Sequence, residues 1–249
     1  MSYFRRQAAA YAAFRPDYPE ELFRFVASLV SRHELAWDCA TGNGQAATRL
    51  AEYFSQVIAT DTSPEQIAHA RRHAKVEYRL APAEASGLPD RSIDLVTVCQ
   101  ALHWFDRPRF FAEVRRVLVL GGALVATLYG DVHIAGDEAL DGLLQRFSKG
   151  TMREYWPGNR KLVDELFAGV EFPFPLLPAP EIKLKKQWTL TQLAGYIRSW
   201  SATDRYIERH GADPVTELEE KMAEGWGDPA KKREIWWPFR IFAGRLESV

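Results

Sequence analysis

The residues best suited to chemistry lie in the stretch WDCATGNGQAA, residues 37–47, where Asp38 ends an apolar run shortly before Gly42 and Gly44. A glycine-rich turn between a strand and a helix lets backbone N–H groups approach a ligand closely. In nicotinamide-dependent enzymes such groups bind a pyrophosphate, and the spacing Gly42-x-Gly44-x-x-Ala47 matches that fingerprint. The turn alone is therefore compatible with a dinucleotide, with a ligand that has no phosphate, or with a tight connection that binds nothing.

Of the two acids near the turn, Asp38 favours a cationic ligand over a dinucleotide. Asp38 stands directly before the turn, where it would repel a pyrophosphate but attract the ammonium and sulfonium groups of S-adenosylmethionine. Asp61 ends the next apolar run, QVIATD, and suits the ribose hydroxyls of either kind of cofactor. The residues thus favour S-adenosylmethionine, and an NAD(P)-dependent oxidoreductase remains the alternative.

These side chains need a parallel sheet to bring them together. Apolar runs at residues 35–38, 56–61, 76–81, 93–100 and 121–129 predict strands, and amphipathic stretches at 19–30, 44–54, 63–74 and 108–118 predict helices between them. Strands that alternate with helices form a parallel sheet covered on both faces, and ligands bind beyond the carboxyl ends of its strands. Asp38 and Asp61 both stand at such ends.

The second half of the chain has a different character. Four prolines interrupt residues 172–181, the stretches 190–200 and 213–226 predict helices, and 180–189 and 233–247 predict extended segments. We expect an α/β, Rossmann-like, doubly wound and mostly parallel seven-stranded sheet, with helices on both faces. The late helices would form a helical cap insertion, and the two late strands would complete the sheet.

Composition excludes several classes of protein. The chain has 249 residues and a net charge of −1, so no global field draws it to nucleic acid or to an anionic membrane. It contains two cysteines, Cys39 and Cys99, and no run long enough to cross a membrane. His69 and His73 lie one helical turn apart without an evident third ligand, so we predict no metal site. A cytoplasmic protein is expected.

The order of motifs resembles the class I S-adenosylmethionine-dependent methyltransferases of type 11, and relatives of trans-aconitate methyltransferase among them. Their first motif, acid-x-Gly-x-Gly-x-Gly, reads here from Asp38 to Gly44 with Ala40 at the first glycine. ATDTSPEQI and DLVTVCQALHWF resemble the second-strand and fourth-strand motifs. YAAFRPDYP resembles a segment that folds over the cofactor in the trans-aconitate relatives, and LAGYIRSWSA resembles a later part of them.

The resemblance implies that S-adenosylmethionine is the cofactor and S-adenosylhomocysteine the product. It places Asp61 on the ribose, Thr62 and Gln66 beside the adenine, and Tyr11 and Arg15 on the cofactor's carboxylate. The backbone of Ala83 and the carboxylate of Glu84 would bind the adenine amino group, because Pro82 stands where the family commonly has Asp. The whole implied cofactor-binding set is Tyr11, Arg15, Asp38, Ala40, Gly42, Gly44, Asp61, Thr62, Gln66, Ala83, Glu84, Gln100 and Ala101.

The same resemblance places His103 beside the reacting atoms, as a general base or a group that positions substrate, although a structural histidine is the alternative. We expect Trp104, Trp200 and Trp237 to wall a pocket for a small-molecule acceptor, whose carboxylate would be methylated. Residues 1–130 would form the cofactor-binding core with an N-terminal covering segment. Residues 131–249 would form the cap and the last two strands of one continuous domain. A cofactor-binding protein without transferase activity is the remaining alternative.

Cys99 invites comparison with the nucleophile of cytosine-C5 methyltransferases, because the sequence reads Cys-Gln. In those enzymes a proline usually precedes the cysteine, whereas Val98 precedes it here. A thiol at the end of an apolar strand is ordinarily a buried side chain. We therefore expect no nucleophilic role for Cys99.

Overall fold

The computed structural model describes residues 15–247, which group into two compact units. The larger unit contains residues 17–129, 165–182 and 239–247, and the smaller unit contains residues 15–16, 130–164 and 183–238. The chain therefore enters the smaller unit at Gly130 and returns to the larger one twice. Among residues 15–247, no helix has the length and apolar character needed to cross a membrane.

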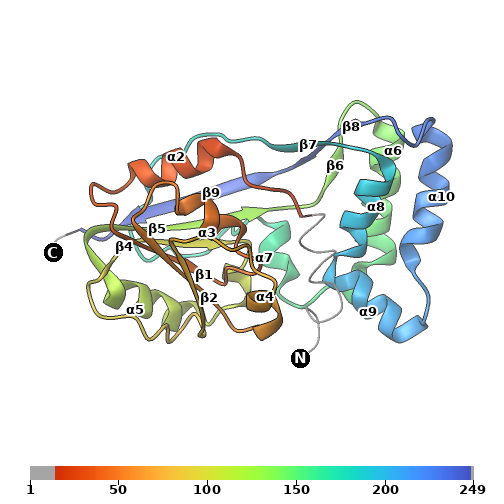
Figure 1. The fold of residues 1–249 in the computed structure, drawn as a ribbon. Coiled ribbons are helices and arrows are strands. Elements are labelled where there is room, and N and C mark those ends of the chain that lie inside the picture. Colours follow the sequence, from red (N-terminus) through yellow and green to blue (C-terminus); the bar gives the residue numbers. More distant parts are fainter. Residues whose placement is uncertain (1–14, 248–249) are drawn as a thin grey trace. The chain divides into compact units, whose positions relative to one another are not determined.

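The larger unit is built on a six-stranded sheet with the order β3-β2-β1-β4-β5-β9 (Figure 1). All neighbouring strands are parallel except β5 and β9, which pair antiparallel. The strands are β1 (Leu35–Cys39), β2 (Gln56–Asp61), β3 (Val76–Leu80), β4 (Ile93–Cys99), β5 (Leu118–Tyr129) and β9 (Phe239–Arg245). The helices are α2 (Glu20–Ser28), α3 (Gln45–Leu50), α4 (Pro64–Ala68), the short 3₁₀ helix η1 (Leu102–Trp104) and α5 (Arg107–Val117).

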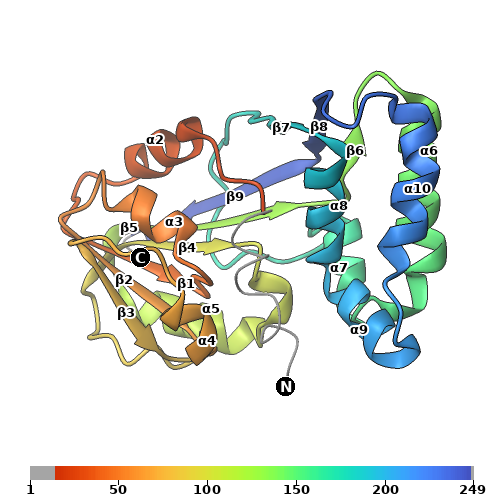
Figure 2. The same cartoon turned by 45° about the vertical axis from the view of Figure 1, so that its right-hand side comes forward.

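Helices cover both faces of this sheet, as the alternating pattern predicts. Helices α2 and α3 pack on one face, where Leu22 and Leu50 join a buried cluster with sheet residues such as Val57. Helix α5 lies on the other face, where Phe110 packs edge-on against Trp37 at 6.2 Å between ring centroids. Figures 1 and 2 show α2 and α5 on opposite sides of the strands. The predicted Rossmann-like fold class is confirmed.

The prediction of seven strands is wrong by one. The chain beside β9 makes only an isolated bridge between Leu176 and Gly244, supported by a hydrogen bond from Leu177 N to Ala243 O at 2.8 Å. Pro175 and Pro178 flank this bridge, and a proline has no N–H to donate to a sheet ladder. The segment that lies where a seventh strand would pair with β9 therefore forms an isolated bridge instead of a strand.

The smaller unit has its own antiparallel sheet, which the sequence did not predict. Its order is β6-β8-β7, with strands β6 (His133–Ile134), β7 (Leu184–Trp188) and β8 (Arg233–Trp237). Of the extended segments expected to complete the main sheet, 180–189 thus pairs elsewhere, and 233–247 is divided between β8 here and β9 in the larger unit.

Helices make up the rest of the smaller unit. They are α6 (Glu138–Arg146), the π-helix η2 (Phe147–Thr151), the 3₁₀ helix η3 (Arg153–Tyr155), α7 (Arg160–Asp164), α8 (Leu190–Arg198), α9 (Ser201–His210) and α10 (Pro214–Trp226). Helix α8 begins with a capping box, in which Thr189 and Gln192 satisfy each other's backbone N–H groups. Helix α10 begins at Pro214, directly after the N-cap Asp213.

Candidate functional site

Asp38 lies at the carboxyl end of β1 and is 1% exposed. Its two carboxylate oxygens accept hydrogen bonds from the hydroxyl groups of Thr41 and Thr97, at 2.5 and 2.7 Å. Burial raises the pKa of Asp38 to about 6, although both hydrogen bonds favour the charged form. The backbone of Ala47 also hydrogen-bonds to this carboxylate. A buried carboxylate surrounded by these neutral donors is suited to a cationic ligand.

The turn after β1 has the left-handed conformations that a glycine-rich motif requires. Ala40, Gly42 and Gly44 have φ values of +53°, +55° and +79°. Asp61 ends β2 and fixes this turn, because Gly42 N donates to its Oδ2 at 2.8 Å, while Ser63 N donates to its Oδ1 at 2.9 Å. The second acid therefore joins the turn to the beginning of α4.

The two glycines of the turn are needed for different reasons. A Cβ atom at Gly44 would lie 2.1 Å from the hydroxyl oxygen of Tyr78, so a side chain there would have to displace Tyr78, and the φ of +79° also favours glycine. A Cβ atom at Gly42 would have Gln66 Oε1 as its nearest neighbour, at 3.9 Å. Gly42 thus leaves room for a ligand on the side where Gln66 lies. At Gly44, the close packing of Tyr78 accounts for the glycine without a ligand.

Two buried polar atoms near Gly42 have no hydrogen-bond partner within the described residues. They are Oε1 of Gln66, a residue that is 3% exposed, and Nδ2 of Asn43, which is 4% exposed. An unsatisfied buried polar atom costs about 1–3 kcal/mol, so such atoms commonly mark a ligand site. Sequence reasoning missed Asn43, and its position between the two glycines was the available signal. The arrangement fits a polar, positively charged cofactor.

The loop after β3 carries the residues expected at the adenine. Ala83 is buried, and Oε1 of Glu84 accepts a hydrogen bond from Asp106 N at 2.9 Å. Ala81 N donates to Asp61 O at 3.1 Å, which holds the start of this loop at the end of β2. Thr62 is exposed at the same edge of the sheet. The structure therefore brings the ribose and adenine candidates to one edge.

At the end of β4, Gln100 has a structural task. Its Nε2 donates to Tyr129 O at 3.0 Å, and its Oε1 accepts from Tyr129 N at 2.8 Å. The side chain thus connects the end of β4 to the end of β5. Any contact of Gln100 with the methionine part of the cofactor would therefore be made by its backbone. Ala101, the next residue, is buried.

His103 and Trp104 follow in η1, beyond the carboxyl end of β4. The His103 ring lies 5.1 Å from the Trp104 ring and 6.4 Å from the Phe167 ring, between centroids. Trp104 is 47% exposed, although it is a large apolar side chain. Trp104 thus lies exposed beside a histidine at the ligand end of the parallel sheet, and its role as an acceptor wall stays a prediction.

Arg15, Trp200 and Trp237 belong to the smaller unit, where Tyr196 connects them. The Arg15 guanidinium lies 5.5 Å from the centre of the Tyr196 ring, and its Nη2 donates to Ser199 O at 3.2 Å. Trp237 Nε1 donates to the Tyr196 hydroxyl at 3.0 Å, and Trp200 packs edge-on against the same ring. Tyr11 lies outside the described residues.

Trp200 and Trp237 are both buried, whereas Trp104 belongs to the other unit. The structure therefore places two of the three predicted wall residues in one aromatic cluster of the smaller unit. That they line an acceptor pocket stays a prediction.

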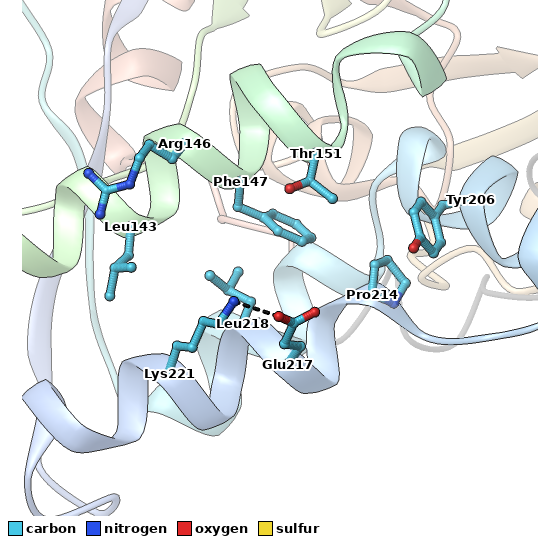
Figure 3. Close-up of a pocket in the computed structure, with 9 residues that line it drawn as sticks. All are labelled: Leu143, Arg146, Phe147, Thr151, Tyr206, Pro214, Glu217, Leu218 and Lys221. Carbon is cyan, nitrogen blue, oxygen red and sulfur yellow. Dashed lines mark hydrogen bonds and ion pairs between the residues drawn. The ribbon is translucent and has the colours of Figure 1, made fainter.

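Figure 3 shows a groove of about 200 Å³ in the smaller unit, between α6 with η2 on one side and α10 on the other. Phe147 points into its centre, and the Lys221 ammonium contacts the Glu217 carboxylate at 2.5 Å on its rim. None of the predicted site residues lines it; the lining residues are Leu143, Arg146, Phe147, Thr151, Tyr206, Pro214, Glu217, Leu218 and Lys221.

Both cysteines are poor nucleophiles in this fold. Burial raises the pKa of the Cys39 thiol and of the Cys99 thiol, and the nearby Asp38 carboxylate raises both further. A thiol that stays protonated does not attack a carbon centre readily. In the part of the chain that the structure describes, no group of three or more His, Cys, Asp or Glu residues is arranged to hold a metal ion.

Comparison with known proteins identifies the family. A model of the methyltransferase domain matches residues 37–126. A Dictyostelium discoideum protein named as a methyltransferase is 34% identical over 219 residues, which cover 87% of this chain and 83% of that protein. A structure described as a type II methyltransferase from Anaeromyxobacter dehalogenans is 39% identical. The match covers 95% of this chain and 100% of that one, with a TM-score of 0.86.

The chain belongs to the class I S-adenosylmethionine-dependent methyltransferases. S-adenosylmethionine is its cofactor and S-adenosylhomocysteine its product. The predicted family and cofactor are confirmed, and the alternative of a nicotinamide-dependent oxidoreductase is set aside.

Proposed function

We propose that this methyltransferase forms a methyl ester on the carboxylate of a small molecule. The proposal is carried by the contact of Arg15 with Tyr196 and Ser199. Arg15 comes from YAAFRPDYP and the other two residues come from LAGYIRSWSA, so two separate segments that resemble the trans-aconitate relatives meet in the structure. Their meeting supports an arrangement similar to that of enzymes whose acceptor is a carboxylate.

The residues at the ends of the strands would hold the cofactor. Asp61 would accept hydrogen bonds from the ribose hydroxyls through the remaining lone pairs of its oxygens, and Gly42 would allow close approach. The negative charge of Asp38 would attract the ligand's ammonium and sulfonium groups. Gln66 and Asn43 would gain partners for their buried polar atoms. When bound, S-adenosylmethionine supplies a methyl group on a positively charged sulfur that is already a good leaving group.

A carboxylate acceptor does not require a general base among the remaining residues. Its oxygen is nucleophilic without losing a proton, so the chain needs only to align it and exclude water. Trp104 would form part of the acceptor wall in the larger unit. We also infer that the acceptor is a small molecule rather than a nucleic acid, because a net charge of −1 provides no global attraction to a polyanion. A cytoplasmic location remains part of the proposal.

A second candidate function is methylation of a hydroxyl or an amine, with His103 as general base. It is favoured by the place of His103 beyond the end of β4, with its ring between Trp104 and Phe167. Such an acceptor must lose a proton, whereas a carboxylate does not. A His103→Asn variant separates the two: for a carboxylate acceptor, kcat should fall less than tenfold and stay independent of pH between 6 and 8.

The direct test is an assay with S-adenosylmethionine labelled in its methyl group and a panel of mono-, di- and tricarboxylic acids, each paired with its amide. Ester formation predicts label that mild alkali releases as methanol. Label that resists alkali would identify an ether or amine product and contradict the proposal. Cofactor binding without transfer to any acid of the panel would contradict carboxylate methylation.

An Arg15→Gln variant tests the expected contact of Arg15 with the carboxylate of the cofactor. We expect the KM for S-adenosylmethionine to rise about tenfold or more, because a hydrogen bond to a charged group contributes about 1.5–3 kcal/mol. Arg209→Gln is the matched control, since Arg209 lies over the Tyr155 ring at 5.9 Å in the same unit but on an exposed helix end. Equal effects of the two variants would show that Arg15 only stabilises the fold.

A further inference from the structure

Glu113 of α5 is hydrogen-bonded to the loop that connects β3 and β4. Its Oε1 accepts two hydrogen bonds from Ser86, one from the backbone N at 2.8 Å and one from the hydroxyl at 2.5 Å. The same hydroxyl oxygen accepts from Leu88 N at 3.2 Å. Ser86 is therefore a buried fixed point of this loop, and a carboxylate on a neighbouring helix sets its position.

The charge on this carboxylate is secured by Arg116, one turn along α5. Arg116 Nε donates to Glu113 Oε2 at 2.8 Å, and Nη2 donates to Oε1 at 2.7 Å. The guanidinium and the Ser86 hydrogen bonds lower the pKa of Glu113 to about 2 against the effect of burial. Arg116 also pairs with Asp90 of the loop at 2.5 Å. A carboxylate with this many donors is rigid and stays charged.

The fixed point lies two residues from Glu84 and three from Ala83. The first end of the loop is joined to Asp61 through Ala81 N, and Glu84 is joined to Asp106 N at the beginning of α5. Ala83 and Glu84 thus lie between Ala81, which is bonded to Asp61, and Ser86, which is bonded to Glu113 of α5. A small shift at Ser86 would move both of them.

We propose that Glu113 is a positioning residue for adenine recognition: through Ser86 it sets the place of Ala83 and Glu84. The inference rests on the proposed role of these two residues at the adenine amino group. Glu113 itself touches Ser86 and Arg116, and its effect on the ligand is indirect. The structural alternative is that the cluster only joins the loop to α5.

The discriminating probe is the pair S-adenosylhomocysteine and S-inosylhomocysteine, in which a keto oxygen replaces the adenine amino group. The Glu84 carboxylate accepts a hydrogen bond from the amino group but repels the keto oxygen. The native protein should therefore bind the first compound at least about tenfold more tightly, because an unpaired buried polar group is rejected strongly. Isothermal calorimetry gives both dissociation constants and hence their ratio.

Two variants and one control then test Glu113. In Glu113→Gln and in Ser86→Ala, the ratio of the two dissociation constants should fall at least about threefold toward one. Val114→Ala is the control, because Val114 is fully buried on the same helix and is not bonded to the loop. It should lower the melting temperature but leave the ratio unchanged. Ser86→Ala keeps the test open if Glu113→Gln does not fold.

The outcomes separate this inference from the proposed site. If the native protein discriminates and both variants discriminate equally well, Glu113 is only structural and the inference is overturned. If the native protein binds both compounds with one affinity, the adenine role of Glu84 is wrong and the inference falls with it. If S-adenosylhomocysteine does not bind, the proposed cofactor site itself has failed.

Discussion

Ala40 stands where the first motif of the family has its first glycine, and its φ is +53°. For a residue with a side chain, this left-handed conformation costs about 1–2 kcal/mol. Ala40→Gly would remove the cost, while the greater freedom of glycine in the unfolded chain would offset about 0.4–1 kcal/mol. We expect the free energy of unfolding in urea to rise by about 0.5–1 kcal/mol, with cofactor binding retained.

Gly42→Ala is the reverse control, because Gly42 has a similar φ of +55°. It should lower the free energy of unfolding by about 1 kcal/mol. A destabilised Ala40→Gly variant would contradict the left-handed assignment.

Asp38 should make the stability of the cofactor-free protein depend on pH. Its pKa is about 6 in the fold against 3.8 in the unfolded chain, so the folded state binds more protons between these values. The contribution of Asp38 to the free energy of unfolding should therefore fall by about 2 kcal/mol as pH rises from 4 to 6, out of about 3 kcal/mol over its whole titration. In Asp38→Asn this fall should disappear, as urea denaturation at a series of pH values would show.

The matched control for that series is Asp90→Asn, whose carboxylate is 75% exposed. It should leave the fall in place. If the native protein showed no fall, the desolvated charge assigned to Asp38 would be wrong. The same variant, Asp38→Asn, should bind S-adenosylmethionine at least about tenfold more weakly at pH 8, because it has lost the charge that attracts the sulfonium.

At this scale the sequence predicted the acids correctly as residues at the strand ends, because an acid after an apolar run has few other places in a parallel sheet. It did not predict the double hydrogen bond between Gln100 and Tyr129, nor the unsatisfied amide of Asn43. Side-chain direction is decided by packing against distant residues, and a single sequence does not display those neighbours.

At the scale of elements, α8 offers a clear test in the smaller unit. The Thr189 hydroxyl caps the helix by accepting from Gln192 N, and Gln192 returns the interaction to Thr189 N. Thr189→Ala should lower the free energy of unfolding by about 1 kcal/mol, because a lost N-cap leaves helix N–H groups unsatisfied. Denaturant unfolding measures the change.

Thr216→Ala is the comparison for that variant, since Thr216 is exposed and its hydroxyl donates a long hydrogen bond, of 3.4 Å, to the N-cap Asp213. Its effect should stay within about 0.5 kcal/mol. Equal effects at the two threonines would mean that the capping box contributes nothing particular.

The sequence predicted the elements of the larger unit well, because buried strands and amphipathic helices alternate there with distinct periods. The prediction from sequence was wrong where the position of a strand depends on which other strand it pairs with. Strands β7 and β8 read as extended segments, but nothing in their own residues shows that they pair with each other. Helix α4 ends at Ala68 instead of continuing to 74, and Arg71 N bonds to Asn43 O in the turn after β1.

At the scale of the whole molecule, the larger unit is assembled from three separated chain segments. Residues 165–182 belong to the larger unit again, but nothing in their composition or periodicity indicates this. The sequence therefore predicts a single boundary near residue 130. The cofactor candidates from Asp38 to Ala101 nevertheless all lie in the larger unit, because they belong to one continuous run of strand and helix units.

Ligand binding should stabilise this assembly measurably. S-adenosylhomocysteine at about 100 times its dissociation constant adds about 2.7 kcal/mol to the free energy of unfolding. For a chain of this length, that corresponds to a rise of about 5–10 °C in the melting temperature. Differential scanning fluorimetry tests it, with NADH at the same concentration as the control. A rise with NADH alone would contradict the cofactor assignment.

The buried position of Asp38 also makes cofactor binding an exchange of protons with the solvent. Near pH 6 the carboxyl is protonated in about half of the cofactor-free molecules, since its pKa is about 6. A cation bound beside it lowers that pKa and expels the proton, which the buffer takes up. The heat measured on binding would then include the buffer's own heat of protonation. Titrations in phosphate and in an amine buffer should differ at pH 6 and agree at pH 8.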